Sequence, residues 1–142
     1  MIFAMAVPRR PPSSNKNRNA SFQANLAADA RTLIREAPML DGPLYIRLAW
    51  FHNRPTKQDV DGIFKNVLDA LKGVVFLDDI LITQCLGSRI DMNAGYEIVE
   101  AYAPSEALSV LYQLLDENHN DILYVEVGPA AVCRVTFGPI DA

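Results

Sequence analysis

Residues 44–79 read LYIRLAWFHNRPTKQDVDGIFKNVLDALKGVVFLDD, and this stretch decides the fold. Apolar side chains alternate over residues 44–51, which predicts a strand with one buried face. A polar loop follows over residues 52–57. From Asp59 or Asp61 to Lys72 the apolar residues return at helical spacing, which predicts an amphipathic helix. The expected buried stripe of this helix consists of Ile63, Phe64, Val67, Leu68 and Leu71.

The flanking sequence predicts a mixture of strands and helices. A short edge strand is expected at residues 2–7, a loop at 9–19 and a helix at 21–36. After the quoted stretch, the predicted elements are a strand at 80–90 with a hairpin partner at 96–102, a helix from 104 to about 118, and strands at 122–127 and 132–137. Irregular alternation of this kind favours an α+β fold, a mixed sheet packed with helices, in a single domain over residues 1–142.

Composition excludes several classes of protein. Half of the 142 residues are hydrophobic, which is too many for a disordered chain. Cys85 and Cys133 are too far apart in sequence for a C-x-x-C metal or redox pair, so we expect reduced, packed thiols. The apolar runs are too short for a membrane-spanning helix, and the N-terminal charge order is the reverse of a signal peptide. We therefore expect a cytoplasmic protein with no membrane partner.

Charge is distributed unevenly along the chain. The net charge is −4, yet residues 1–57 carry nine Lys or Arg against three carboxylates, whereas residues 58–142 carry four against fourteen. A local basic surface is sufficient for binding phosphate. The candidate residues for contacting nucleic-acid phosphates are Arg9, Arg10, Lys16, Arg18 and Lys57. A solvated, mobile basic arm is the alternative interpretation.

Carboxylates gather in the helical part of the quoted stretch. Asp61, Lys65 and Asp69 are four residues apart, so they share one helix face, and Asp59 stands at the helix entrance. Asp78 and Asp79 begin the next predicted strand. We expect the start of the helix and the start of the strand to bring these groups together at one edge of the sheet.

A cluster of this kind has two interpretations. Neighbouring carboxylates repel one another, and a hard divalent cation such as Mg²⁺ or Mn²⁺ removes that repulsion. Bound metal can activate water for phosphodiester hydrolysis, with Lys65 neutralising charge on the phosphate. Alternatively, the aspartates cap the helix and form an ordinary solvent-facing charge ladder. Spacing alone leaves both interpretations open.

The order of these residues resembles the RusA family of Holliday-junction resolvases. The resemblance rests on Asp59-x-Asp61, Lys65, the Asp69-Ala70-Leu71 run and Asp78-Asp79. It includes the preceding strand and the Pro11-Pro12-Ser13-Ser14-Asn15 loop, and covers roughly residues 3–102. Family members usually carry Asn after the second aspartate, where this chain has Gly62. Residues 103–142, predicted to add a helix and strands, lie outside the resemblance.

The resemblance implies a homodimeric, Mg²⁺-dependent endonuclease that cleaves four-way DNA junctions symmetrically. Its catalytic residues would be Asp59, Asp61, Lys65 and Asp79. The metal would be held by the three aspartates, with Asp78 as a further ligand candidate. Asp69 and His52 are secondary candidates, and an exposed loop position is the alternative for His52. Two other functions remain open: a non-catalytic DNA-binding relative, which Gly62 invites, and a metal-dependent hydrolase of small phosphate compounds.

Overall fold

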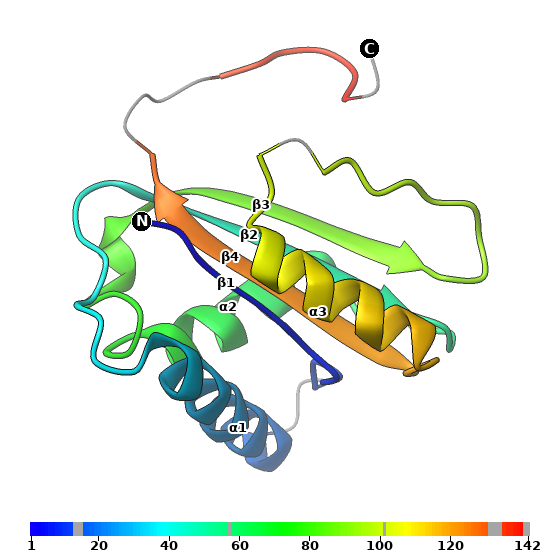
Figure 1. Ribbon diagram of the computed structural model, residues 1–142, viewed down its shortest axis with the longest axis horizontal. Coiled ribbons are helices and arrows are strands. Elements are labelled where there is room, and N and C mark those ends of the chain that lie inside the picture. Colours follow the sequence, from blue (N-terminus) through cyan, green and yellow to red (C-terminus); the bar gives the residue numbers. More distant parts are fainter. Residues whose placement is uncertain (13–15, 57, 101, 131–134, 141–142) are drawn as a thin grey trace.

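The computed structural model describes residues 1–12, 16–56, 58–100, 102–130 and 135–140. Five of its elements precede residue 82: β1 (Phe3–Val7), α1 (Lys16–Ile34), β2 (Leu44–His52), α2 (Val60–Leu71) and the 3₁₀ turn η1 (Asp79–Leu81). They are followed by β3 (Ile82–Asp91), α3 (Ser105–Asp116) and β4 (Asp121–Pro129). Figure 1 shows these elements arranged as one sheet with helices on both faces.

The sheet is mixed, with the strand order β1-β4-β2-β3. β4 lies between β1 and β2 and is antiparallel to both, whereas β2 and β3 are parallel. Helix α2 therefore forms a β-α-β crossover between β2 and β3, as parallel neighbours require. The prediction of an α+β fold with a mixed sheet is confirmed.

Each face of the sheet has its own hydrophobic cluster. α1 and α2 pack against one face, with Leu26, Trp50 and Val67 fully buried there. α3 packs against the other face, where Phe51, Leu111 and Ile122 are buried. The fold therefore has three layers, which are α1 with α2, the sheet, and α3. Figure 1 shows α3 on the side of the sheet opposite α2. Apolar burial of this kind is the main favourable term in folding.

The decisive stretch folds largely as predicted. The strand and the helix occupy β2 and α2, and Ile63, Val67 and Leu71 are buried. Phe64 and Leu68 flank this stripe and are only partly buried. The exposed face of α2 carries Asp61, Lys65 and Asp69.

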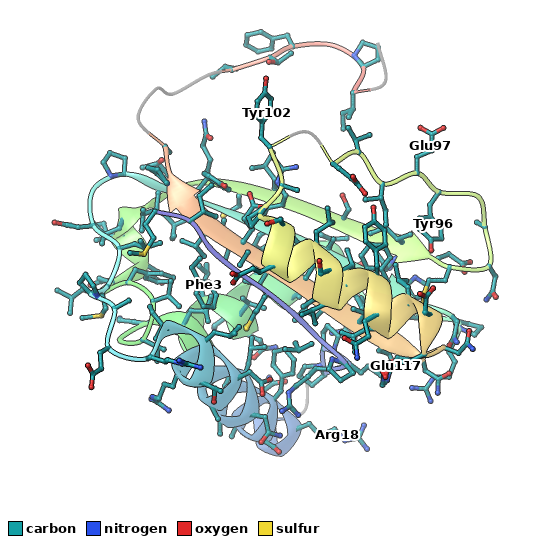
Figure 2. The ribbon with its side chains drawn as sticks, viewed as in Figure 1. Phe3, Arg18, Tyr96, Glu97, Tyr102 and Glu117 are labelled. Atoms are coloured by element: carbon teal, nitrogen blue, oxygen red, sulfur yellow. The ribbon has the colours of Figure 1, made fainter. Side chains whose placement is uncertain are left out.

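The predicted hairpin is wrong. β3 follows the turn Asp79–Leu81 and pairs with β2 over its whole length, and residues 96–100 form no strand. Ile98 packs against the cluster on the α3 face instead, and the Tyr96 ring lies 5.9 Å from that of Phe51, whereas Val99 is exposed. Figure 2 shows Glu97 and Tyr102 pointing away from the sheet.

Other expectations differ from the structure at element ends. α1 begins at Lys16, inside the expected loop, because its first turn is polar and leaves no apolar period to detect. The predicted strand at 132–137 falls partly on residues 131–134, outside the described residues, and 135–137 form no strand. Cys85 is free but exposed on β3 rather than packed, and burial of part of its side chain raises the pKa of its thiol. Cys133 lies outside the described residues.

Among the helices that the structure describes, none combines the length and the apolar character needed to span a bilayer.

Candidate nucleic-acid interface and metal site

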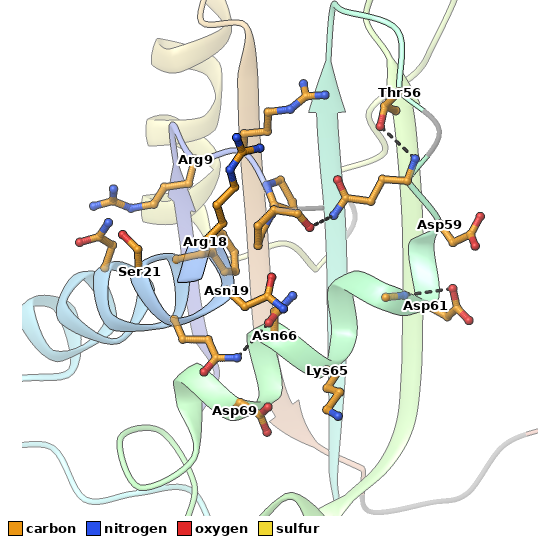
Figure 3. A pocket seen from close by; sticks show the side chains of 18 of the residues that line it. Arg9, Arg18, Asn19, Ser21, Thr56, Asp59, Asp61, Lys65, Asn66 and Asp69 are labelled. Atoms are coloured by element: carbon orange, nitrogen blue, oxygen red, sulfur yellow. Dashed lines mark hydrogen bonds between the residues drawn. The ribbon is translucent and has the colours of Figure 1, made fainter. Parts of the chain in front are cut away.

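A pocket of about 1240 Å³ lies between the N-terminal segment, α1 and the start of α2. Figure 3 shows Arg9, Arg18 and Asn19 on the α1 side, Asp61 and Lys65 on α2, and Asp59 just before the start of α2. The pocket therefore brings basic residues from the first part of the chain beside acidic residues from the second. The charge asymmetry of the sequence becomes a local arrangement of opposite charges.

Asp59 and Asp61 stand at the start of α2. Asp59 occupies the N-cap position with an extended backbone, but its side chain makes no capping hydrogen bond. Asp61 accepts one hydrogen bond from the backbone N–H of Gly62 at 3.0 Å. Figure 3 shows both side chains on the side of the helix away from α1. Side-chain capping therefore does not explain Asp59. This residue is exposed at the N-terminus of α2, where the helix dipole places partial positive charge.

Lys65 and Asp69 continue along the exposed face of α2, and both line the pocket. Behind them, the buried side chain of Asn66 accepts a hydrogen bond from Gln23 of α1 at 2.9 Å. This bond ties α2 to α1 and fixes the floor of the pocket. Lys65 therefore lies on the exposed face of a helix whose opposite face is fixed against α1.

Two arginines on the basic side of the pocket form ion pairs with carboxylates elsewhere in the fold. Arg9 forms a two-point ion pair with Asp29 of α1, at 2.6 and 3.0 Å, and this pairing raises the pKa of Arg9. Arg10 pairs with Asp121 at 3.0 Å. Arg18 stands near the exposed end of α1, as Figure 2 shows. Lys16 begins α1, but its side chain is not described, and Lys57 lies outside the described residues.

The segment leading into α2 is tethered at both sides. Gln58 donates a side-chain hydrogen bond to the carbonyl oxygen of Pro12 and accepts one from Arg89 of β3 on its own carbonyl oxygen. Its backbone N–H donates to Thr56 Oγ1 at 3.1 Å. The position of Asp59 is thereby linked to the N-terminal segment and to β3.

Asp78 and Asp79 do not join the other aspartates within one chain. Asp78 forms an ion pair with Lys72 at 3.7 Å, at the end of α2 opposite Asp59, and α2 is about 18 Å long. Hydrogen bonding with the side chain of Asp79, then with the backbone N–H of Ile80, lowers the pKa of Asp78. The expected convergence at one sheet edge is wrong because β3, parallel to β2, must begin at the far end of the crossover helix. Within the described part of the chain, no three His, Cys, Asp or Glu side chains are grouped to hold a metal ion.

His52 is the last residue of β2 and is buried rather than exposed in a loop. Its Nδ1 lies 2.9 Å from the carbonyl oxygen of Arg54, and its ring lies 5.1 Å from that of Trp50. These contacts anchor the loop after β2. The secondary candidate therefore occupies a structural position behind the pocket.

Sequence reasoning missed four residues that build this region: Gln58, Asn66, Arg54 and Asp121. Their partners lie between 31 and 111 residues away along the chain. Neither spacing nor periodicity gives a signal for contacts of such long range.

The fold and the pocket together define a small α+β domain in which basic residues of the N-terminal segment and α1 line the same pocket as acidic residues at the start of α2. A model of the endodeoxyribonuclease RusA family matches residues 12–99, which include the Asp59 to Asp79 segment. The chain belongs to the RusA family, whose enzymes act on Holliday-junction DNA. No curated protein matches the chain.

Proposed function

We propose that this protein is a metal-dependent, structure-selective endonuclease that resolves four-way DNA junctions by phosphodiester hydrolysis. The observation that carries the proposal is the position of Asp59, Asp61 and Lys65. They lie inside the segment matched by the family and line a pocket whose opposite side is basic. A DNA backbone entering this pocket would meet arginines on one side and carboxylates on the other.

The donor set suits a hard cation. Exposed carboxylate oxygens are ligands that Mg²⁺ and Mn²⁺ accept, and Asp59 has a carboxylate that no cap occupies. Asp59, Asp61 and Asp79 would hold the ion. When bound, the ion would lower the pKa of water and stabilise charge on the scissile phosphate. Lys65, one helical turn beyond Asp61, would contact the phosphate as a cation.

A second copy of the chain would supply the missing carboxylate. Asp79 is separated from Asp59 within one chain, and the residues around it form an exposed apolar patch of Met39, Leu77 and Ile80. Leu77 is 68% exposed and Ile80 is 81% exposed, and contiguous apolar patches of this kind can mark protein–protein contact sites.

β3 offers a second reason for dimerisation. It is an edge strand of ten residues that are mostly exposed, and such an edge is a template for pairing with another chain. A two-fold dimer uses the same surface on both copies, so two sites form together. We propose that Asp78 and Asp79 of one chain complete the site begun by Asp59 and Asp61 of the other. This arrangement suits a junction that needs two matched cuts.

The test is cleavage of a labelled four-way junction with and without Mg²⁺. We expect the wild-type protein to make paired nicks only with the metal, and Asp61→Asn to lose at least about a hundredfold in rate, because a metal ligand becomes neutral. Asp69→Asn is the matched control: it makes the same change on the same helix face and is expected to cost far less.

Each alternative has its own outcome. Junction binding without cleavage in Mg²⁺ or Mn²⁺ would select the non-catalytic relative. Hydrolysis of small phosphate esters without junction binding would select the other class of hydrolase. Equal cutting by wild type and Asp61→Asn would show that Asp59 and Asp61 do not form the catalytic site.

A further inference from the structure

The carboxylate of Asp121 lies buried at the edge of the basic side of the pocket. Asp121 is the first residue of β4, pairs in register with His52 of β2, and is 7% exposed. Its Oδ1 accepts hydrogen bonds from Arg10 Nη1 at 3.0 Å and from the Trp50 indole N–H at 3.1 Å. Its Oδ2 accepts one from Arg54 Nη2 at 2.9 Å.

Two arginines therefore converge on a single carboxylate. A buried carboxylate must be paired and hydrogen-bonded to be tolerated, and one cation would suffice for charge balance. With two guanidinium groups the cluster retains one net positive charge. The side chains of Arg10 and Arg54 remain 37% and 55% exposed, so neither is enclosed by the protein.

The guanidinium groups are also held in orientation. Arg10 lies over the Trp50 ring, 5.5 Å from its centroid, which adds a cation–π contact to the ion pair. Arg54 belongs to the loop that His52 anchors, five residues before Asp59. Each guanidinium has five N–H donors, of which the Asp121 bonds use one each.

Their placement connects them to the pocket. Arg10 lines the same pocket as Asp59 and Asp61. Arg54 lies outside that lining, but it shares the Asp121 carboxylate with Arg10, and the two residues that follow it, Pro55 and Thr56, line the pocket. Two oriented guanidinium groups with unused donors make a site for one phosphate, because planar N–H forks match phosphate oxygens.

We propose that Asp121 is a positioning residue that holds Arg10 and Arg54 as a clamp for one backbone phosphate of the DNA. The clamp rests on the proposed function, since its ligand is DNA. It distinguishes Arg54, which no motif marks, from the other basic residues of the chain. It also assigns to a buried acidic residue a role in binding a polyanion.

The experiment is a double-mutant cycle on junction affinity, measured without divalent metal over a series of salt concentrations. Arg10→Gln should weaken binding by about five- to tenfold and reduce the salt slope by about one. Asp121→Asn removes a negative charge and should nevertheless weaken binding. In the Asp121→Asn background, Arg10→Gln should have an effect of less than about twofold, because Arg10 is no longer held.

A second cycle leaves the buried carboxylate intact and keeps the test valid if Asp121→Asn does not fold. Arg10→Gln and Arg54→Gln should be non-additive, since both arginines bind the same phosphate. Arg31→Gln is the matched control: it removes the same charge from the last turn of α1 and should leave the salt slope unchanged.

Three results would overturn the clamp: unchanged or tighter binding by Asp121→Asn, equal effects of Arg10→Gln in both backgrounds, or additive effects of the two arginines. Cleavage by the same samples separates the two proposals. A wild-type protein that shows the coupling but never cuts would contradict the endonuclease and support the clamp. One that cuts without coupling would overturn the clamp alone, and one that binds no DNA would overturn both.

Discussion

Asp59 occupies an N-cap position where aspartate is favoured, yet its carboxylate makes no capping bond. The interpretation of Asp59 as a side-chain cap therefore fails on a single side-chain orientation, which the sequence does not determine. The structure does not require glycine at the neighbouring Gly62. A Cβ at this residue would meet nothing within 4 Å, so neither packing nor a positive φ requires glycine.

We therefore expect Gly62→Ala to stabilise the protein. Alanine has a higher helix propensity, so the free energy of unfolding should rise by up to about 1 kcal/mol and Tm by about 2–5 °C. The measurement is thermal unfolding followed by circular dichroism. Gly73→Ala is the matched control and should destabilise, because Gly73 has a φ of 79°. A lower Tm for Gly62→Ala would contradict this account of α2.

At the scale of elements, β2 and β4 share a polar network on the α3 face of the sheet. The buried Glu126 accepts hydrogen bonds from the hydroxyls of Tyr45 and Tyr124, at 2.5 and 2.6 Å. Burial, and then the bonds to Glu126, raise the pKa of both tyrosines. The folded state therefore favours the protonated hydroxyls.

The sign of the pH dependence follows. A group whose pKa is raised by folding contributes stability below its ordinary pKa, about 10 for tyrosine, and loses it as the pH rises further. We expect Tyr45 and Tyr124 to ionise well above the ordinary tyrosine pKa of about 10. Ultraviolet difference titration of wild type and Glu126→Gln checks this. Glu126→Gln should bring the late ionisations to lower pH, and a single ordinary transition for all tyrosines in the wild type would contradict the network.

Elements differ in how well the sequence predicts them. β2 and α2 were predictable because the spacing of their apolar residues indicates which face is buried, and this pattern can be read from a short stretch of sequence. The partner of β3 was not predictable in this way, since its pairing with β2 depends on a crossover of some thirty residues. The segment after β3 has strand-like residues, but Tyr96 and Ile98 pack against the cluster that contains Phe51, and residues 96–100 form no ladder.

The same distinction applies to the candidate site of the whole molecule. Asp61, Lys65 and Asp69 were placed on one exposed face by helical spacing alone, as the structure has them. The distance of Asp79 from Asp59 depends on the direction of β3, and the cluster around Asp121 joins residues from both ends of the chain. Such relations arise from topology, which local patterns do not encode.

We expect the whole molecule to be a dimer held partly by the patch of Met39, Leu77 and Ile80. Ile80→Lys should shift sedimentation from dimer to monomer and abolish cleavage, because it places a charge in the apolar patch. The variant monomer should still unfold cooperatively, because Ile80 is 81% exposed and contributes little to the core. Val110→Lys on α3 is the control, a charge added at another exposed apolar residue. A dimer unaffected by Ile80→Lys would place the interface elsewhere.

The most direct measurement of the central claim mixes two inactive variants, Asp61→Asn and Asp79→Asn. If each site takes Asp61 from one chain and Asp79 from the other, the mixed dimer has one intact site and one with both substitutions. The account predicts that the refolded mixture regains Mg²⁺-dependent nicking of a four-way junction, about half the molecules being mixed dimers with one working site. A mixture as inactive as either variant alone, beside a wild type that cuts, would contradict it.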